Sequence, residues 1–298
     1  MIYYLTASVY YIFLVPVSLL PLWVLYKISD GLAWLLFRVV KYRKKVIEGG
    51  MRRSFPDKTE VEIQADTYLF YQHLSDLLVE SIKNFTIKKE DALPRLHCKN
   101  PELIDAFAQQ GRSIIIAAGH YNNFEFVVYA ISQLIKHTPR GLYMPLANQF
   151  FDQKIAQSRS ALGFQLVPKQ KLKKFFEVDP SQNPVALLFA MDQAPTDPAK
   201  AHWMMFLNQE TGVQFGTEKY AKNYDLPVVY GRINKEKRGV YSFEFELITA
   251  NPRQEPTGMI TEKMTRLLEA DIVAKPAYWL WSHRRWKHPR PPQMTLNQ

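Results

Sequence analysis

The sequence has little cysteine and glycine, and these shortages exclude several kinds of site. Cys98 is the only cysteine among 298 residues, so the chain can form neither an internal disulfide nor a cysteine-ligated zinc cluster. The twelve glycines never occur in the G-x-x-x-x-G-K-[ST] pattern of a phosphate-binding loop. A G-x-S-x-G nucleophile elbow is also absent, which argues against a serine acyl-enzyme. No pattern in the sequence predicts a metal site or a cofactor.

Charged residues are missing from the beginning of the chain. Residues 1–26 carry no charged side chain and are long enough to span about 30 Å of hydrocarbon as a helix. Pro16 and Pro21 interrupt this apolar run, which allows a kinked span or a re-entrant segment. A second apolar stretch, 32–37, is too short to span and can lie in the membrane interface. The alternative is a buried core helix. A cleaved signal peptide fits poorly, because no basic region precedes the run.

A basic cluster at residues 41–45 follows the apolar segment, and it places the chain after it in the cytoplasm. We therefore expect residues 1–40 to form an N-terminal membrane anchor, as a transmembrane or interface helical segment. Residues 41–298 are expected to form one cytoplasmic domain, since a chain of this length can bury a single large core.

The composition favours anionic partners. The formal net charge is +10 and the pI is about 9.4, so lipid headgroups, nucleic acid and an acidic carrier protein are all compatible. Aromatic residues make up 13% of the chain, which is typical of proteins that work where water meets lipid. There is no zinc-finger spacing or RNA-binding signature, so we expect a lipid partner and no nucleic acid.

The apolar patterns beyond the first segment alternate between strands and helices. No internal repeat or low-complexity tract is present. Predicted strands are 112–118, 142–145, 185–191, 228–233 and 241–248, and predicted helices are 59–85, 122–136, 151–162 and 260–272. Thr59-x-x-Glu62 is a capping box, and Pro276 ends the last helix. This alternation predicts an α/β fold with a central, mostly parallel or mixed sheet flanked by helices on both faces.

His120 and Glu125 are the main candidates for chemistry. On one continuous helix, a spacing of five residues would leave the two side chains about 140° apart. They can meet only if His120 lies in the turn between the strand that ends near Ala118 and the next helix. Ligands of open α/β sheets bind at this end of the strands. A neutral imidazole there can take a hydroxyl proton while a carboxylate fixes its tautomer.

Two structural interpretations compete with this catalytic one. Glu125 is also placed to be the third residue of a capping box whose cap is Asn122. His120 can equally be a hydrogen-bonded histidine that closes the strand. Spacing and context alone leave these alternatives open.

The motif His120-x4-Glu125 after an apolar strand resembles the signature of the lysophospholipid acyltransferase superfamily. More closely, the chain resembles the late lauroyl and myristoyl transferases of lipid A biosynthesis, over nearly its whole length. The matching motifs, in chain order, are Tyr42-Arg43-Lys44-Lys45, Arg53-Ser54-Phe55-Pro56, Gly119-His120, Tyr143-x-Pro145 with Asn148 and Arg159, Asp192-Gln193, Phe206 with Gly216-Thr217, and the tail Tyr278-Trp279-Leu280-Trp281-Ser282-His283-Arg284-Arg285-Trp286-Lys287.

The resemblance implies that His120 deprotonates an acceptor hydroxyl, which then attacks an acyl thioester directly, and that Glu125 orients His120. It also implies substrate-binding roles for three residues. Arg159 would steady a substrate phosphate or an oxyanion, Asp192 would hold an active-site loop or Arg159, and Asn123 would contact substrate. Neither a cofactor nor a metal is implied.

The implied partners are acyl carrier protein as acyl donor, a lipid A precursor as acceptor, and the bilayer of the inner membrane. The basic stretch 169–174 is either a contact for the acidic carrier or a solvated face. Gly49-Gly50-Met51 and Ala277-Tyr278 depart from the pattern of the family, so a lysophospholipid or aminolipid acceptor stays open. A non-catalytic membrane protein of the same fold is the third alternative.

The acyl chain requires a dry channel beside His120. Phe124 and Val128 are expected to line this channel, because they lie on the helix that leaves the same turn. Their alternative role is plain core packing.

Overall fold

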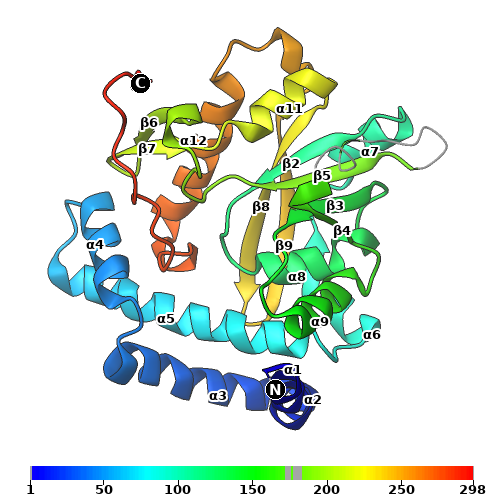
Figure 1. Cartoon of the computed structure of the whole chain (residues 1–298), viewed down its shortest axis with the longest axis vertical. Helices are drawn as coiled ribbons and strands as arrows, with labels where there is room; N and C mark the ends of the chain where they lie inside the picture. Colours follow the sequence, from blue (N-terminus) through cyan, green and yellow to red (C-terminus); the bar gives the residue numbers. More distant parts are fainter. Residues whose placement is uncertain (1, 172–175, 177–182, 298) are drawn as a thin grey trace.

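The computed structural model describes residues 2–171, 176 and 183–297. Residues 172–174 of the predicted basic stretch lie outside this part of the chain. The helices and strands form a layered α/β molecule, with one large sheet and two long N-terminal helices beneath it in Figure 1. The predicted fold class is confirmed at this level.

The central sheet is mixed and has seven strands in the order β1-β9-β8-β2-β5-β3-β4. Neighbours β8, β2, β5, β3 and β4 run parallel, β8 and β9 run antiparallel, and β1 runs parallel to β9. The strands are β1 (Leu96–Cys98), β2 (Ile114–Ala118), β3 (Thr138–Tyr143), β4 (Gln165–Pro168), β5 (Val185–Ala190), β8 (Val228–Lys237) and β9 (Val240–Thr249). The central strand β2 is apolar throughout, because helices cover both of its faces.

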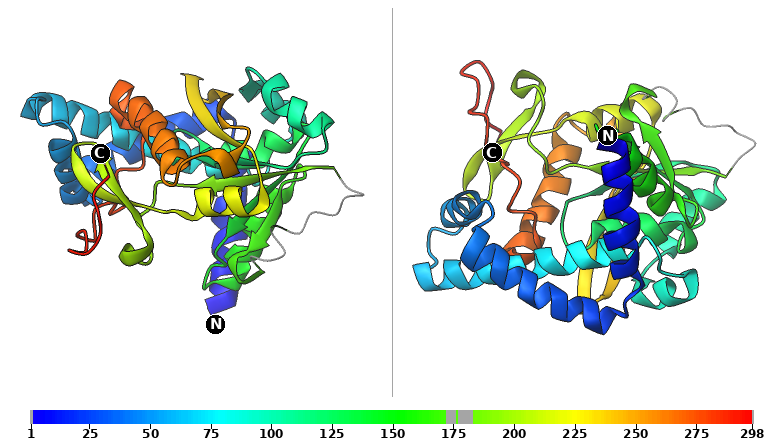
Figure 2. Two further views of the ribbon diagram at one scale, coloured as in Figure 1. Left: turned by 90° about the horizontal axis from the view of Figure 1, so that it is seen from above. Right: turned by 60° about the horizontal axis from the view of Figure 1, so that its bottom comes forward.

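Successive side chains of each central strand enter two different hydrophobic clusters, one on each face of the sheet. On one face, Ile115 and Ala117 pack with α11 (Gly216–Tyr224) and α12 (Met259–Ala274). On the other face, Ile114 and Ile116 pack with α7 (Glu102–Gln109) and α8 (Phe124–Ala130). The predicted helices on both faces are therefore present, and Figure 2 shows α12, in orange, beside the strands of the sheet.

Helix α5 (Glu60–Lys83) runs beside the end of the sheet where β2 ends and where β8 turns into β9 (Figure 1). It begins at the predicted capping box, since Thr59 Oγ1 accepts the Glu62 amide and Glu62 accepts the Thr59 amide. On its other side α5 packs along α3 (Leu22–Trp34). Leu25 and Ala33 of α3 are buried, and Ser29 Oγ donates a hydrogen bond to Asp76 of α5 at 2.8 Å.

The N-terminal segment is bent rather than straight. It comprises α1 (Ile2–Val9), a π-helical turn (Tyr10–Leu14), α2 (Val15–Leu19), α3 and a second π-helical turn (Leu35–Val40). In the described part of the chain, no single helix is long and apolar enough to cross a membrane, although Thr6–Leu19 and Leu22–Val40 pass that test together as a pair bent by 116°. Pro21 lies in this bend with an extended backbone. The anchor at residues 1–40 stays a prediction.

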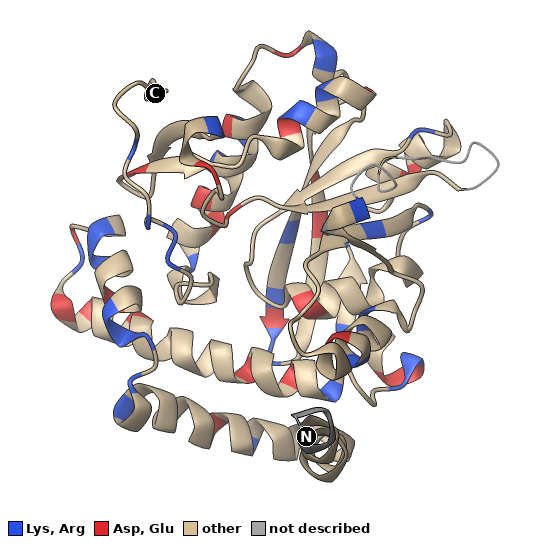
Figure 3. Cartoon of the chain, viewed as in Figure 1, with Lys and Arg blue, Asp and Glu red and all other residues tan. Residues whose placement is uncertain are grey.

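Charge and exposure change abruptly after this segment. Figure 3 shows that the first helices carry few charged residues, whereas α4 (Lys44–Ser54) carries several lysines and arginines. The outer sides of the N-terminal helices expose large apolar side chains, among them Ile12, Phe13, Trp23 and Trp34. An apolar surface flanked by cations is typical of a segment that lies on anionic lipid.

The structure corrects several predicted boundaries and adds elements that the sequence did not indicate. The helix predicted at 122–136 ends at Ala130 and continues only as a 3-10 turn (Ile131–Gln133). The strand predicted at 142–145 is β3, which ends at Tyr143. Other predicted elements are α9 (Gln149–Ser160), β8 and β9, which differ by a few residues at their ends. Unpredicted elements are α4, α7, α11, the short strands β1 and β4, and a separate hairpin of β6 (His202–Phe206) and β7 (Gln209–Val213).

Candidate active site

His120 lies two residues after the end of β2, in the turn that leads into α8, as predicted. Gly119 allows this turn to approach α12, because a Cβ atom at residue 119 would lie 2.6 Å from Leu268 Cδ1. Asn122 has a φ of 55°, in the left-handed region, and turns the chain into the helix. The local sequence thus places a histidine at the C-terminal end of a central strand, next to β5.

Asp192 is the residue that holds His120. Its Oδ1 lies 2.7 Å from His120 Nδ1, and its Oδ2 accepts the His120 backbone amide at 2.8 Å. Trp279 Nε1 also donates to Asp192 Oδ2 at 2.8 Å. Asp192 follows β5 and is buried, so the two neighbouring strands bring carboxylate and imidazole together at one edge of the sheet.

The contacts between Asp192 and His120 shift the pKa of both side chains. Burial is the largest single influence on His120 and opposes its protonation, but the charge and hydrogen bond of Asp192, with a smaller effect from Glu125, outweigh it and raise the pKa of His120. Burial likewise opposes ionisation of Asp192, yet the contacts with His120 and Trp279 lower its pKa to about 2. Asp192 is therefore a carboxylate at neutral pH, and it favours a proton on Nδ1.

Glu125 does not occupy the position that the sequence predicted for it. Its carboxylate forms a two-point ion pair with Arg159 of α9, at 2.9 Å from Nε to Oε2 and 2.5 Å from Nη2 to Oε1. The prediction that Glu125 orients His120 is not met by this geometry, because Asp192 takes Nδ1. Glu125 is the second residue of α8 rather than the third, and the helix cap is Asn123, so the capping-box alternative is also wrong.

The side chain of Asn123 has a structural role in the fold. Its Oδ1 accepts the Phe126 amide as the cap of α8, and its Nδ2 donates to Glu80 of α5 at 2.5 Å. The side chain is buried, and both ends of its amide have protein partners. The structure therefore gives Asn123 a positioning role, which differs from the substrate contact that the resemblance implied. Of the two roles implied for Asp192, the hold on an active-site loop matches the structure, because Asp192 accepts the backbone amide of the His120 turn, whereas Arg159 is held by Glu125.

The other ring nitrogen of His120 faces a more open side. Gln193 Nε2 lies 3.3 Å from His120 Nε2, and 15% of the His120 side chain is exposed. His283 of the C-terminal tail lies nearby, where its Nε2 accepts the Ala194 amide. Sequence reasoning gave Gln193 and Trp279 no individual role, although both belong to motifs that it singled out. Only the fold shows that both lie at this site, because Trp279 pairs with Tyr121 of the His120 turn and donates to Asp192, while Gln193 reaches His120 Nε2.

An apolar cavity of about 180 Å³ begins beside His120 and lies between α8 and the sheet. Phe124 and Val128 line it, which confirms that the predicted pair faces a cavity next to the histidine. The deeper walls come from Ile116, Leu142, Phe164, Leu166, Leu188 and Phe243. Glu125 and Arg159 also line the cavity, so a charged pair and an imidazole border an otherwise apolar space.

The site contains the parts of a general base. Among the described residues, no three His, Cys, Asp or Glu side chains lie close enough together to hold a metal ion. A neutral His120 that carries its proton on Nδ1 can accept a proton at Nε2 from a hydroxyl that replaces the Gln193 contact, and Asp192 can stabilise the imidazolium that forms.

Comparison with known proteins identifies the family of the chain. No curated protein matches the sequence. The family of bacterial lipid A biosynthesis acyltransferases matches residues 1–288, so the chain belongs to this family and is an acyltransferase.

Proposed function

We propose that the protein transfers a fatty acyl chain from the thioester of acyl carrier protein to a hydroxyl of a lipid A precursor. The observation that carries the proposal is the His120–Asp192 pair at the mouth of an apolar cavity. A base at this position can serve a polar acceptor, and the cavity can bury the acyl chain, at about 0.8 kcal/mol per CH₂. Membership of the family supports a lipid acceptor.

The reaction is a direct transfer of one acyl group from the thioester to the hydroxyl. His120 Nε2 takes the proton of the acceptor hydroxyl, and the oxygen attacks the carbonyl carbon of the thioester. The carbon–sulfur bond then breaks, and the proton passes from Nε2 to the departing thiolate. Asp192 keeps the other proton on Nδ1 and stabilises the ring while it is charged. The attacking oxygen and the carbonyl must lie within about 3.5 Å of each other for this step.

Arg159 supplies positive charge at the mouth of the cavity. Glu125 fixes the guanidinium with two hydrogen bonds, and both side chains are about seven-tenths buried, with 30% and 27% exposed. A cation held there can stabilise the negative charge that develops on the carbonyl oxygen, or bind a phosphate of the acceptor. In this proposal Glu125 acts through Arg159.

The N-terminal segment is proposed to hold the site at the cytoplasmic surface of the inner membrane. Its exposed apolar side chains and the cations of α4 support contact with anionic lipid, because each of the two features favours the interface. Helices α3 and α5 are packed together, so this contact would place α5 and the adjoining His120 turn close to the lipid.

Transfer by the purified full-length chain in detergent tests the proposal. Acyl carrier protein thioesters would be offered with a lipid A precursor, a lysophospholipid or an aminolipid, and the products identified by mass spectrometry. We expect acylation of the lipid A precursor, and a loss of at least about 10²-fold in His120→Ala. Transfer only to another lipid would change the acceptor while keeping the chemistry. Lipid binding without any transfer would indicate a non-catalytic protein.

Deleting the gene gives an independent readout in the cell. The proposal expects lipid A that lacks one acyl chain, detected by mass spectrometry of the membrane lipids. Restored acylation by the wild-type gene, but not by the His120→Ala gene, would assign the missing chain to this site.

A further inference from the structure

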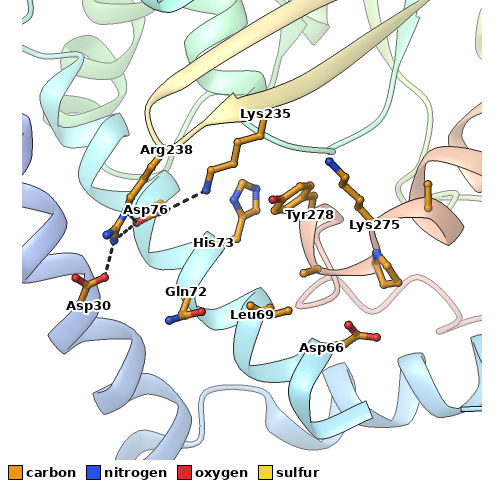
Figure 4. A pocket seen from close by; sticks show the side chains of 13 residues that line it. Asp30, Asp66, Leu69, Gln72, His73, Asp76, Lys235, Arg238, Lys275 and Tyr278 are labelled. Atoms are coloured by element: carbon orange, nitrogen blue, oxygen red, sulfur yellow. Dashed lines mark hydrogen bonds and ion pairs between the residues drawn. The ribbon is translucent and has the colours of Figure 1, made fainter. Parts of the chain in front are cut away.

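A second cavity, of about 460 Å³, lies away from the apolar cavity of His120 and is called the polar cavity here, because charged and polar side chains make up much of its wall. Figure 4 shows it between α3, α5, the turn joining β8 to β9, and the end of α12. Its described lining residues include none that line the cavity beside His120. The volume is within the range of small-molecule sites, about 300–1,000 Å³.

The carboxylates in the wall of this polar cavity already have cationic partners. Arg238 pairs with Asp76 at 2.6 Å and with Asp30 at 2.7 Å, and Lys235 Nζ lies 3.2 Å from Asp76 Oδ2. These ion pairs are the dashed lines of Figure 4. Asp66 pairs with Lys58 outside the cavity. Since each carboxylate is neutralised, the wall has no spare negative charge to attract a cation.

His73, in contrast, lines the same cavity without a hydrogen-bond partner in the described part of the chain. His73 is only 3% exposed, yet neither of its ring nitrogens has a hydrogen-bond partner among the described residues. Its ring lies 4.7 Å from the Tyr278 ring and is directed into the space between Tyr278 and Lys235 (Figure 4). A buried polar group without a partner is costly, so a polar ligand in this cavity would stabilise the imidazole.

Lys275 adds a positive charge at the opposite wall. Its ammonium lies 6.0 Å from the centre of the Tyr278 ring, and the described part of the chain places no carboxylate within ion-pair distance of it. Lys235 is more buried, with 12% of its side chain exposed, and shares Asp76 with Arg238. Thus two ammonium groups and one imidazole border the same space, and the negative charges near them are already neutralised.

We propose that this polar cavity binds a phosphate monoester group, held by Lys275, Lys235 and the ring of His73. A phosphate offers several strong acceptor oxygens in different directions, which suits donors that come from separate walls. The remaining volume can hold the sugar or glycerol that carries the phosphate. This site is separate from acyl transfer, and its occupancy does not depend on the proposed reaction.

The protonation of His73 agrees with such a ligand. Burial, reinforced by the charge of Lys235, lowers the pKa of His73 well below its ordinary value, so the ring is neutral and keeps one N–H donor. A bound phosphate would add negative charge next to the ring and move its pKa upward. The ring signals of His73 therefore report binding directly.

The phosphate can come from a lipid headgroup or from a soluble phosphorylated compound. Asp30 at the edge of the cavity lies on α3, the same helix that exposes Trp23 and Trp34 on its outer side. The cavity thus adjoins the surface that is proposed to touch lipid, which favours a headgroup. Both sources share the same recognition chemistry, and two probes separate them.

Binding to the full-length chain in detergent tests the site. Inorganic phosphate and glycerol 3-phosphate would be titrated by calorimetry, while nuclear magnetic resonance follows the labelled histidine rings. Lys275→Ala should weaken binding about tenfold, as expected for one charge-assisted hydrogen bond. His73→Phe keeps an aromatic ring beside Tyr278 but removes both nitrogens, and it should bind similarly weakly. Lys263→Ala, an exposed lysine of α12 outside the cavity, is the matched control.

The second probe is a phosphatidylcholine vesicle with or without phosphatidic acid. Weaker binding of Lys275→Ala and His73→Phe to the phosphatidic acid vesicles, with Lys263→Ala unchanged, would identify a lipid headgroup as the source. Weaker binding of these variants to the soluble probes alone would support a soluble phosphate compound. Equal affinity of all four proteins for every probe, or no response of the His73 signals, would overturn the site whether or not the protein transfers acyl groups.

Discussion

Asp192 contacts His120 at two points, the ring nitrogen Nδ1 and the backbone amide, although the residues are 72 positions apart in the sequence. The two contacts fix both the orientation of the ring and the position of the turn that carries it. Trp279 donates a third hydrogen bond to the same carboxylate from the C-terminal tail. The geometry of the base therefore depends on β2, β5 and the tail together.

Asp192→Asn should lower turnover by about 10²–10⁴-fold while the protein stays folded. An amide cannot stabilise the imidazolium, and it can present an N–H to Nδ1, which favours the wrong tautomer of His120. Turnover with acyl carrier protein thioester, measured beside the melting temperature, checks this expectation. Near-normal turnover in a folded variant would remove Asp192 from the mechanism.

The pH dependence gives a separate test of the same pair. His120 accepts a proton only when its ring is neutral, and its pKa in the protein is raised above 6.5. We expect kcat/KM to rise with pH through a midpoint above this value. In Asp192→Asn the burial of the ring would dominate and lower its pKa, so the residual activity should rise through a lower pH. An unchanged midpoint would show that the titrating group is not His120.

Glu125→Gln should lose about tenfold in kcat/KM, less than His120→Ala, because Glu125 acts through Arg159. The matched measurement is a double-mutant cycle with Arg159→Met. If the two side chains work as one ion pair, the double variant should be little worse than Arg159→Met alone. Additive losses would instead mean that Glu125 has a role of its own at His120.

The elements that surround the site were predicted well, because each produces a pattern among residues that are neighbours in the sequence. The buried strand β2, the turn at His120 and the capping box at Thr59 each follow from a short pattern. The cavity beside Phe124 and Val128 followed from the same turn. The short strands β1 and β4 have three and four residues, too few for a periodic pattern to appear.

The partner of His120 could not be chosen from spacing alone. Glu125 is near in sequence, whereas Asp192 becomes near only because β2 and β5 are adjacent in the sheet. The order of strands is a property of the whole fold, so a motif that names both carboxylates does not say which one reaches Nδ1. Asn123 shows the same limit, since its buried partner Glu80 lies 43 residues away on α5.

Removing residues 1–40 should destabilise the protein more than removing residues 1–20. The longer deletion takes away Leu25 and Phe37, both buried, and each fully buried apolar side chain of this size contributes about 1.5–3 kcal/mol. It also leaves Asp76 without its hydrogen bond from Ser29. Melting temperatures of the two truncated proteins and the full chain in the same detergent test this. Equal melting temperatures would show that α3 serves only as an anchor.

Val128→Phe should shorten the acyl chain that the protein prefers without removing the base. Val128 lines the apolar cavity on α8, on the helix that begins after the His120 turn, so a larger side chain would fill space that a donor chain needs. Competition between acyl carrier protein thioesters of graded length measures the preference, and we expect an optimum that is shorter by about two to four carbons, in proportion to the volume that is filled. Val273→Phe is the control, because Val273 is exposed on α12 and lies outside the cavity. A uniform loss of activity at every chain length in Val128→Phe would mean that Val128 only packs in the core and that the acyl chain binds elsewhere.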